Sequence, residues 1–348
     1  MQLYLHIGIH KTGSSAIQRF LYQNRKQLLK NGWIYPNHAT RGSAHHPLAA
    51  LYLEKERRPK FLSEYKHQLA GLKKFIKAHP QEIMLLSSEY FGAIENVERL
   101  KNDLCSTGFT SIKIIVYLRR QDEILVSGYN QVVKAKNETR KFDVHFNKMN
   151  WFTLLQKWEK AFSKENLIVR AYQKEQLTQG LTSHFTEILG LNDVKWEKPE
   201  QQVNQSLDLD LLEVKRLANI VEYPLSISTL NKINNMLTSF PQQKLLSKQQ
   251  SQEIINYFSE SNKQVAQRYL KRENLFDKES PKDEKEIFQG LQLEKVVTVM
   301  LGILIDSKRA NHRHFGKKIQ KNNTLLFLCF IAIFIQTIAI SYLLFKIL

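Results

Sequence analysis

The chain has 348 residues, enough for one full α/β catalytic domain, and its hydrophobic content of 43% is typical of a globular protein. It carries 51 Lys and Arg residues against 33 Asp and Glu, a net charge of +18. This balance indicates a polyanionic partner or a lysine-rich solvated surface. Cys105 and Cys329 lie in unrelated contexts, which excludes a disulfide framework and a cysteine-based metal site and indicates a reducing compartment.

Strand and helix patterns alternate through the first two hundred residues. Apolar runs predict strands over residues 3–7, 82–87, 112–118 and 167–171. Helical spacing predicts helices over residues 14–29, 47–53 and 61–78 and around Trp151 and Trp158, and residues 33–46 are predicted to form a loop. The run 112–118 is almost continuously apolar, which is typical of a strand buried on both faces. The pattern therefore predicts an α/β fold, with a central parallel sheet flanked by helices.

From residue 206 onward the strand patterns end and helical periodicity continues over 207–221, 230–240 and 247–269. We therefore divide the chain into an α/β core over 1–205, a helical part over 206–305 and a basic collar over 306–323. Residues 324–345 follow as a candidate membrane anchor.

The candidate anchor is uncharged, and 22 helical residues span about 33 Å, enough to cross the hydrocarbon core. The basic collar before it predicts that this flank stays cytoplasmic. We expect a single C-terminal transmembrane helix, with the catalytic domain facing the cytoplasm at a bacterial inner membrane. The alternative is a buried core helix.

The segment from Gly8 to Gly13 directly follows the first strand and opens a helix, the context of a phosphate-binding loop. Lys11 supplies a cation, and hydroxyl donors are present at Thr12, Ser14 and Ser15. An ATP-binding loop places its Lys directly after the second Gly, whereas here Ser14 occupies that position. This spacing argues against ATP–Mg²⁺ chemistry.

The run LHIGIHKTGSSAIQRFL resembles the 5′-phosphosulfate loop of sulfotransferases that use 3′-phosphoadenosine 5′-phosphosulfate (PAPS), most nearly their bacterial and carbohydrate-type members. The resemblance covers roughly residues 1–277 and implies the P-loop-like sulfotransferase fold. It implies PAPS as co-substrate with no metal, and contacts to PAPS from His10 and from the loop. Lys11 would stabilise the charge left on the departing nucleotide, with Thr12, Gly13, Ser14 and Ser15 as phosphate donors.

Members of this family also bind the 3′-phosphate through an Arg and a Ser eight residues later. Arg119 and Ser127 have this spacing after the strand 112–118, although Arg120-Gln121 replaces the common Asp-Pro. Arg120 is either a further nucleotide contact or a surface charge.

Sulfuryl transfer requires a base near Lys11 to accept the proton of the attacking group. Glu89 follows the strand 82–87, where the resembled carbohydrate sulfotransferases place a catalytic Glu, and it is our candidate base. His46 is the alternative, because histidine suits base chemistry near neutral pH.

The predicted function is transfer of a sulfuryl group from PAPS to a hydroxyl or amine of a saccharide, glycolipid or related membrane-associated acceptor. No nucleic-acid partner is expected, and the sequence does not indicate the oligomeric state. The alternatives are a P-loop kinase or ATPase, and a non-catalytic membrane scaffold that retains a nucleotide pocket.

Overall fold

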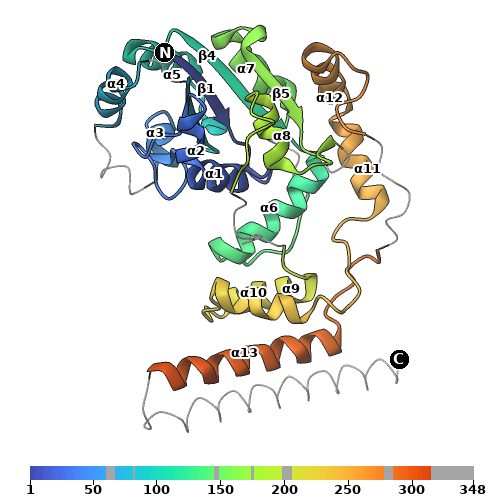
Figure 1. Ribbon diagram of the computed structural model, residues 1–348. Coiled ribbons are helices and arrows are strands. Elements are labelled where there is room, and N and C mark those ends of the chain that lie inside the picture. Colours follow the sequence, from blue (N-terminus) through green and yellow to red (C-terminus); the bar gives the residue numbers. More distant parts are fainter. Residues whose placement is uncertain are drawn as a thin grey trace, which may run out of the picture.

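The computed structural model describes residues 1–59, 67–80, 83–144, 149–173, 176–197, 206–277 and 285–314. These residues contain a five-stranded sheet with the order β2-β3-β1-β4-β5 (Figure 1). Every neighbouring pair is parallel. The strands are β1 (Gln2–Ile7), β2 (Trp33–Ile34), β3 (Ile83–Ser88), β4 (Ser111–Leu118) and β5 (Leu167–Ala171).

Helices cover both faces of the sheet, and each face has its own hydrophobic core. One core joins Leu85 and Tyr117 of the sheet to side chains of α1 (Ser14–Gln23), α2 (Arg25–Lys30) and α8 (Leu181–Ile188). The opposite core contains Leu5 and Val116. The helices that contribute to it include α3 (His46–Ala50), α4 (Gln68–Ala78), α5 (Val97–Thr107), α7 (Trp151–Phe162), α11 (Lys248–Tyr257) and α12 (Ser259–Val265). The predicted α/β class, a parallel sheet between helices, is confirmed.

Two local predictions differ from the structure. The segment 33–46, predicted as a loop, begins with β2, whose Trp33 and Ile34 pair with Ile83 and Met84 of β3. The helix predicted over 14–29 is divided at Asn24, whose side-chain amide donates to the carbonyl oxygens of Phe20 and Glu197. The backbone angles of Asn24 depart from the helical values (φ −91°, ψ 16°), although its amide still donates to the Phe20 carbonyl.

The helical part has its own core around α9 (Leu209–Ile220), α10 (Ile227–Met236) and α13 (Leu293–His314). The long helix α6 (Gln121–Lys136) connects this part to the sheet, because Val133 belongs to the same core (Figure 1). The predicted boundary between residues 305 and 306 lies inside α13.

Within the part of the chain that the structure describes, no helix is long and apolar enough to cross a membrane. The predicted anchor, residues 324–345, lies outside that part, as do residues 315–323 of the collar. Membrane anchoring therefore stays a prediction from the sequence.

The strand order places a topological switch point between β1 and β4. The chain leaves β1 toward β2 and β3 on one side, whereas β4 leads to β5 on the other side. Crevices at such points, outside the carboxyl ends of the strands, are where parallel sheets bind ligands. Both predicted phosphate motifs follow these two strands, so the topology brings them together.

Candidate functional site

The loop after β1 is held by contacts that require its glycines. Gly8 donates its amide to the carbonyl of Ser88 at 3.1 Å, and a Cβ on Gly8 would lie 2.5 Å from the Ser14 hydroxyl oxygen. Gly13 caps α1 with φ +77°, where a Cβ would lie 2.2 Å from a methyl carbon of Leu181. Any larger residue at either glycine would push the loop away from its neighbours.

The hydroxyls of the loop have different surroundings. Thr12 is fully buried and donates to the carbonyl of Ile9 at 2.7 Å, and Ser14 donates to the same oxygen at 3.3 Å. These two hydroxyls therefore close the turn of the loop. Ser15 is exposed and lines a cleft. The first amides of α1 have no intrahelical acceptor and, without an acidic residue in the first turn, are suited to an anion.

Lys11 lies at the crest of the loop with φ +69°, a backbone conformation that costs a non-glycine residue roughly 1–2 kcal/mol. Such strain is common where function requires a fixed geometry. Burial lowers the pKa of Lys11, and the positive charges of Arg119 and Lys134 lower it further. A bound phosphate would relieve this repulsion between cations.

Arg119 directly follows the last residue of β4, and its side chain contacts the loop after β1. Its Nη1 donates to the carbonyl of Lys11 at 2.8 Å, and its Nε donates to Glu123 at 2.6 Å. The guanidinium lies over the ring of Tyr172, 5.3 Å from its centroid. The indole of Trp151 donates to the Arg119 carbonyl at 3.0 Å and fixes its backbone. The two predicted phosphate motifs therefore touch, although their residues are 108 positions apart.

The helix α6 carries Ser127, the other residue of the second motif, and Arg120 directly precedes the helix. Ser127 is 9% exposed and lines the same cleft as Lys11 and Arg119. Arg120 also lines it, but its guanidinium is buried and forms an ion pair with Asp122 at 2.8 Å. Of the two expectations for Arg120, a surface charge is therefore wrong.

Glu89 lies directly after β3 and also lines the cleft. Its Oε2 accepts a hydrogen bond from Gln18 of α1 at 3.0 Å, and its Oε1 lies 3.7 Å from Nε2 of His46. Burial raises the pKa of Glu89, but the influence of His46, the Gln18 hydrogen bond and its own backbone outweighs burial. The pKa is therefore lower than the ordinary value of 4.5, and Glu89 is ionised at neutral pH.

His46 is not among the residues that line the cleft, and it begins α3 beside Glu89. Its Nδ1 is 2.8 Å from the Ser88 hydroxyl, and its ring stacks on Tyr90 with centroids 4.5 Å apart. Burial lowers the pKa of His46, against the opposing charge of Glu89. This geometry suits a residue that positions Glu89 better than a base that meets the acceptor.

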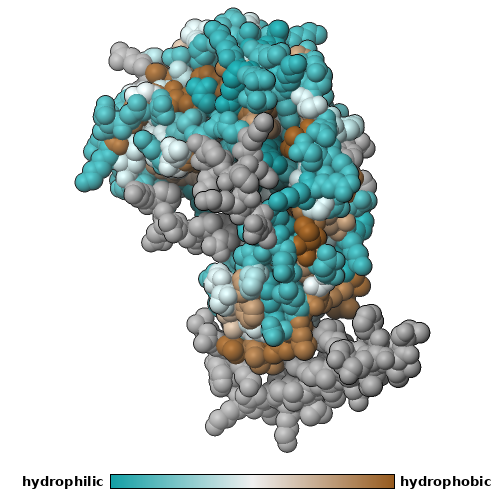
Figure 2. Space-filling model, turned by 90° about the vertical axis from the view of Figure 1, so that its right-hand side faces the viewer, coloured by the Kyte–Doolittle hydropathy of each residue, from teal (hydrophilic) through white to brown (hydrophobic). Residues whose placement is uncertain are grey.

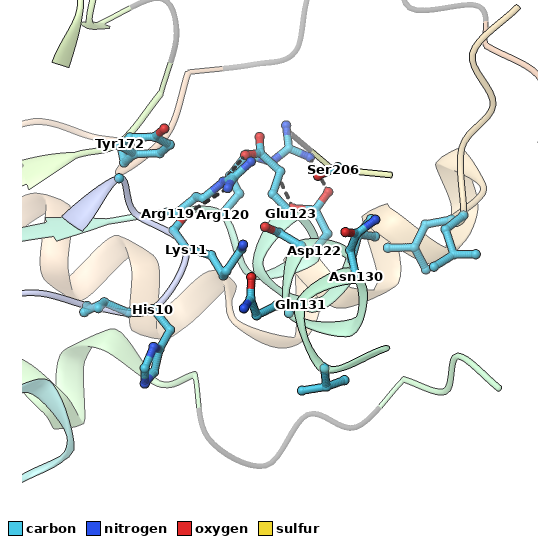
Figure 3. Close-up of a pocket in the computed structure, with 18 of the residues that line it drawn as sticks. His10, Lys11, Arg119, Arg120, Asp122, Glu123, Asn130, Gln131, Tyr172 and Ser206 are labelled. Carbon is cyan, nitrogen blue, oxygen red and sulfur yellow. Dashed lines mark hydrogen bonds and ion pairs between the residues drawn. The ribbon is translucent and has the colours of Figure 1, made fainter. Parts of the chain in front are cut away.

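Lys11, Glu89, Arg119 and Ser127 all line one cleft of about 1780 Å³ between the sheet and the helical part. Figure 3 shows the Lys11 side chain directed toward α6, while His10 points away from it. The predicted residues that line the cleft are His10, Lys11, Gly13, Ser14, Ser15, Glu89, Arg119 and Ser127. Thr12 and His46 stand outside this lining.

Sequence reasoning missed three groups that support the site: Gln18, Glu123 and Tyr172. Glu123 follows Arg119 by four positions on a helix, a spacing that predicts an ion pair. Gln18 and Tyr172 meet their partners only through the tertiary fold, and no local pattern marks them. Among the described residues, no group of three or more His, Cys, Asp or Glu side chains is placed to hold a metal ion.

The fold and the cleft define an α/β protein with a cation-rich site at the carboxyl edge of a parallel sheet. No family model matches the chain. An uncharacterised protein of Archaeoglobus fulgidus is 29% identical over 206 residues, which are 56% of this chain and 55% of that protein. The chain thus spans about half the length of the curated relative that it matches.

Among solved structures, a sulfotransferase from Alicyclobacillus acidocaldarius is similar with a TM-score of 0.41 and 14% identity. The match covers 65% of this chain and 97% of that one.

Proposed function

We propose that the chain is a sulfotransferase that moves a sulfuryl group from PAPS to a hydroxyl or amine of a saccharide or glycolipid acceptor. The observation that carries this proposal is the contact between the two phosphate motifs, in which Arg119 donates to the Lys11 carbonyl at 2.8 Å. Lys11 follows β1 and Arg119 follows β4, so two cations lie at the same switch point. PAPS, which carries phosphate on both its 5′ and its 3′ oxygen, requires cations at two positions of this kind.

Each group has a defined task in an in-line displacement. The acceptor oxygen or nitrogen forms a bond to sulfur while the bond from sulfur to the bridging oxygen of the 5′-phosphate breaks. Glu89 takes the acceptor proton, and Lys11 stabilises the negative charge left on the nucleotide. Arg119 and Ser127 hold the 3′-phosphate, and the amides of Gly13, Ser14 and Ser15 surround the 5′-phosphate.

The cleft favours this reaction over phosphoryl transfer. Ser14 occupies the position of the phosphate-binding Lys of an ATP loop, and its hydroxyl donates to the Ile9 carbonyl. The strand β4 contains no acidic residue and is followed by Arg119. The cleft also exceeds the roughly 300–1,000 Å³ of a typical ligand pocket. Room therefore remains for an acceptor beside the nucleotide. A non-catalytic scaffold has no need for an ionised Glu89 that lines the same cleft as Lys11.

The proposal is tested by incubating the full chain with PAPS labelled in its sulfate and with a bacterial membrane glycan fraction. Label in the glycan fraction, without added metal, supports sulfuryl transfer. Transfer of phosphate from ATP with Mg²⁺, and none of sulfate from PAPS, would establish the kinase alternative.

Replacing Glu89 by glutamine should lower kcat about 10²–10⁴-fold, the usual contribution of a general base. In the wild type the rate should fall only as pH drops through the lowered pKa of Glu89, because the base works when ionised. His46→Gln should retain most of the rate at neutral pH. The fall in rate at low pH should begin at a higher pH than in the wild type, because His46 helps to keep the pKa of Glu89 low. Full turnover in Glu89→Gln would show that Glu89 is not the base, and the alternative, His46, would be tested next.

A further inference from the structure

The long helix α13 is apolar on two opposite faces. Its inner face packs into the helical part through Val296, Val299 and Ile303, which are at most 8% exposed. Its outer face carries four side chains that are 45% to 60% exposed: Leu293, Val297, Leu301 and Ile305. They recur every four residues, so they form one stripe along the helix. Figure 2 shows hydrophobic residues gathered at this end of the molecule.

The sequence that follows this stripe is basic and then apolar. Six cations come first, Lys308, Arg309, Arg313, Lys317, Lys318 and Lys321, and residues 324–345 are then uncharged. An exposed apolar stripe next to a cluster of Lys and Arg is the pattern of a helix that lies in the interface of an anionic membrane.

We propose that the outer face of α13, defined by Leu293, Val297, Leu301 and Ile305, lies on the surface of an anionic lipid bilayer. A second copy of the chain fits this face less well than an anionic surface, because each copy carries a net charge of +18. Residues 315–323 span at most about 30 Å, so the end of α13 lies within this distance of any membrane that residues 324–345 enter. The proposal does not depend on the transfer reaction.

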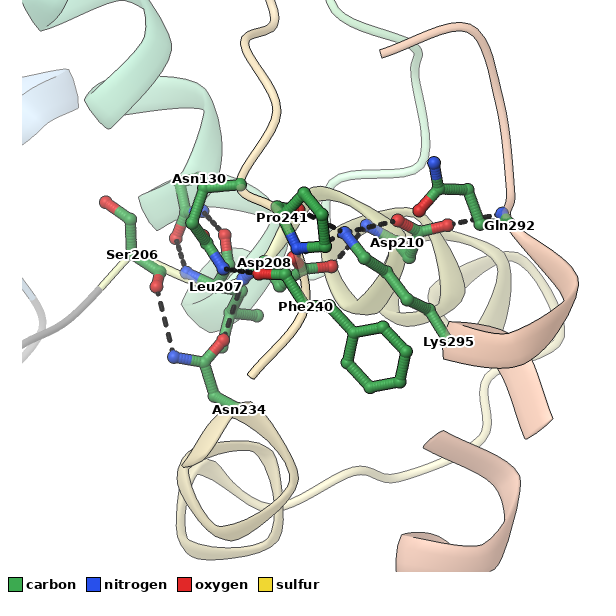
Figure 4. Close-up of polar contacts among 11 residues, drawn as sticks. Asn130, Ser206, Leu207, Asp208, Asp210, Asn234, Phe240, Pro241, Gln292 and Lys295 are labelled. Carbon is green, nitrogen blue, oxygen red and sulfur yellow. Dashed lines mark hydrogen bonds and ion pairs between the residues drawn. The ribbon is translucent and has the colours of Figure 1, made fainter. Parts of the chain in front are cut away.

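Buried charges connect α13 to the wall of the cleft. Lys295, on the inner face of α13, lies between two buried carboxylates, 3.0 Å from Asp208 and 3.3 Å from Asp210 (Figure 4). Asp210 also accepts the backbone amide of Gln292 at 2.6 Å, and Asp208 lines the cleft. A bilayer that holds α13 would therefore hold this wall of the cleft in a fixed orientation above the membrane surface.

The test labels the full chain with an environment-sensitive fluorophore in vesicles of equal parts phosphatidylglycerol and phosphatidylcholine. One sample carries the label at position 301, through Leu301→Cys with Cys105→Ser and Cys329→Ser. The control keeps the native, exposed Cys105 on α5 and carries only Cys329→Ser. Because α5 and α13 lie at opposite ends of the molecule, the control reports on water-exposed surface (Figure 1).

We expect lipid-borne quenchers to reduce the emission at position 301 and aqueous iodide to leave it unchanged, with the reverse at Cys105. Iodide quenching at 301 as strong as at Cys105 would overturn the proposal. Shielding of position 301 from both quenchers would overturn it too, because it would show that protein covers the stripe, either residues 324–345 or a second copy.

Discussion

Replacing Lys11 by alanine is expected to slow sulfuryl transfer by about 10²–10³-fold, the usual loss when one donor to a developing negative charge is removed. The ammonium group acts on the charge that appears as the sulfuryl group leaves, so kcat should fall more than the affinity for PAPS. Alanine retains the strained backbone of position 11 (φ +69°), and the loss therefore reports on the side chain. The measurement is steady-state transfer from labelled PAPS.

Two variants control for charge and position. Lys11→Arg keeps a cation at the crest of the loop and should retain more activity than Lys11→Ala. Lys30→Ala removes an exposed cation from α2, outside the cleft, and should leave kcat unchanged. A Lys11→Ala enzyme with wild-type kcat would show that the leaving group is stabilised elsewhere.

Replacing Lys295 by methionine is expected to lower the free energy of unfolding by about 3–5 kcal/mol, the usual cost of removing one partner of a buried ion pair. The Lys295 side chain is 1% exposed, and those of Asp208 and Asp210 are 3% and 0% exposed. Methionine fills a similar volume but leaves two buried carboxylates without a cation. Denaturant unfolding of the full chain measures the change.

A surface pair provides the matched control. Lys101 lies 3.9 Å from Glu98 on α5, with side chains 38% and 56% exposed. Lys101→Met should change the free energy of unfolding by less than about 1 kcal/mol, because water screens exposed pairs. Equal effects of the two substitutions would show that the carboxylates near Lys295 find other partners.

The sequence predicted the sheet well where a strand is long enough to show a pattern. The strands β1, β3, β4 and β5 were expected within one residue at each end, because each is an apolar run followed by a turn. The strand β2 was not predicted, because two residues are too few to show a periodic pattern. Only their pairing with β3 defines them as a strand.

The residues of the candidate site likewise fall into those that the sequence predicts and those that only the tertiary fold reveals. Lys11, Arg119 and Glu89 were found because each follows a strand, and the carboxyl ends of parallel strands share one edge. The hydrogen bond from Gln18 to Glu89 joins residues 71 positions apart, and nothing local predicts it. The burial of Thr12 and the partial burial of His46 also depend on packing, so their assigned roles could not be judged from spacing.

The central claim is that the cleft binds PAPS, and calorimetric measurement of adenosine 3′,5′-bisphosphate binding tests it most directly. This nucleotide carries phosphate on both the 3′ and the 5′ oxygen of its ribose, and its binding needs no acceptor. We predict binding without Mg²⁺ that is strongly weakened in Arg119→Ala and in Lys11→Ala, and retained in Lys30→Ala. Binding of ATP only, and only with Mg²⁺, would contradict the assignment of the cleft to PAPS.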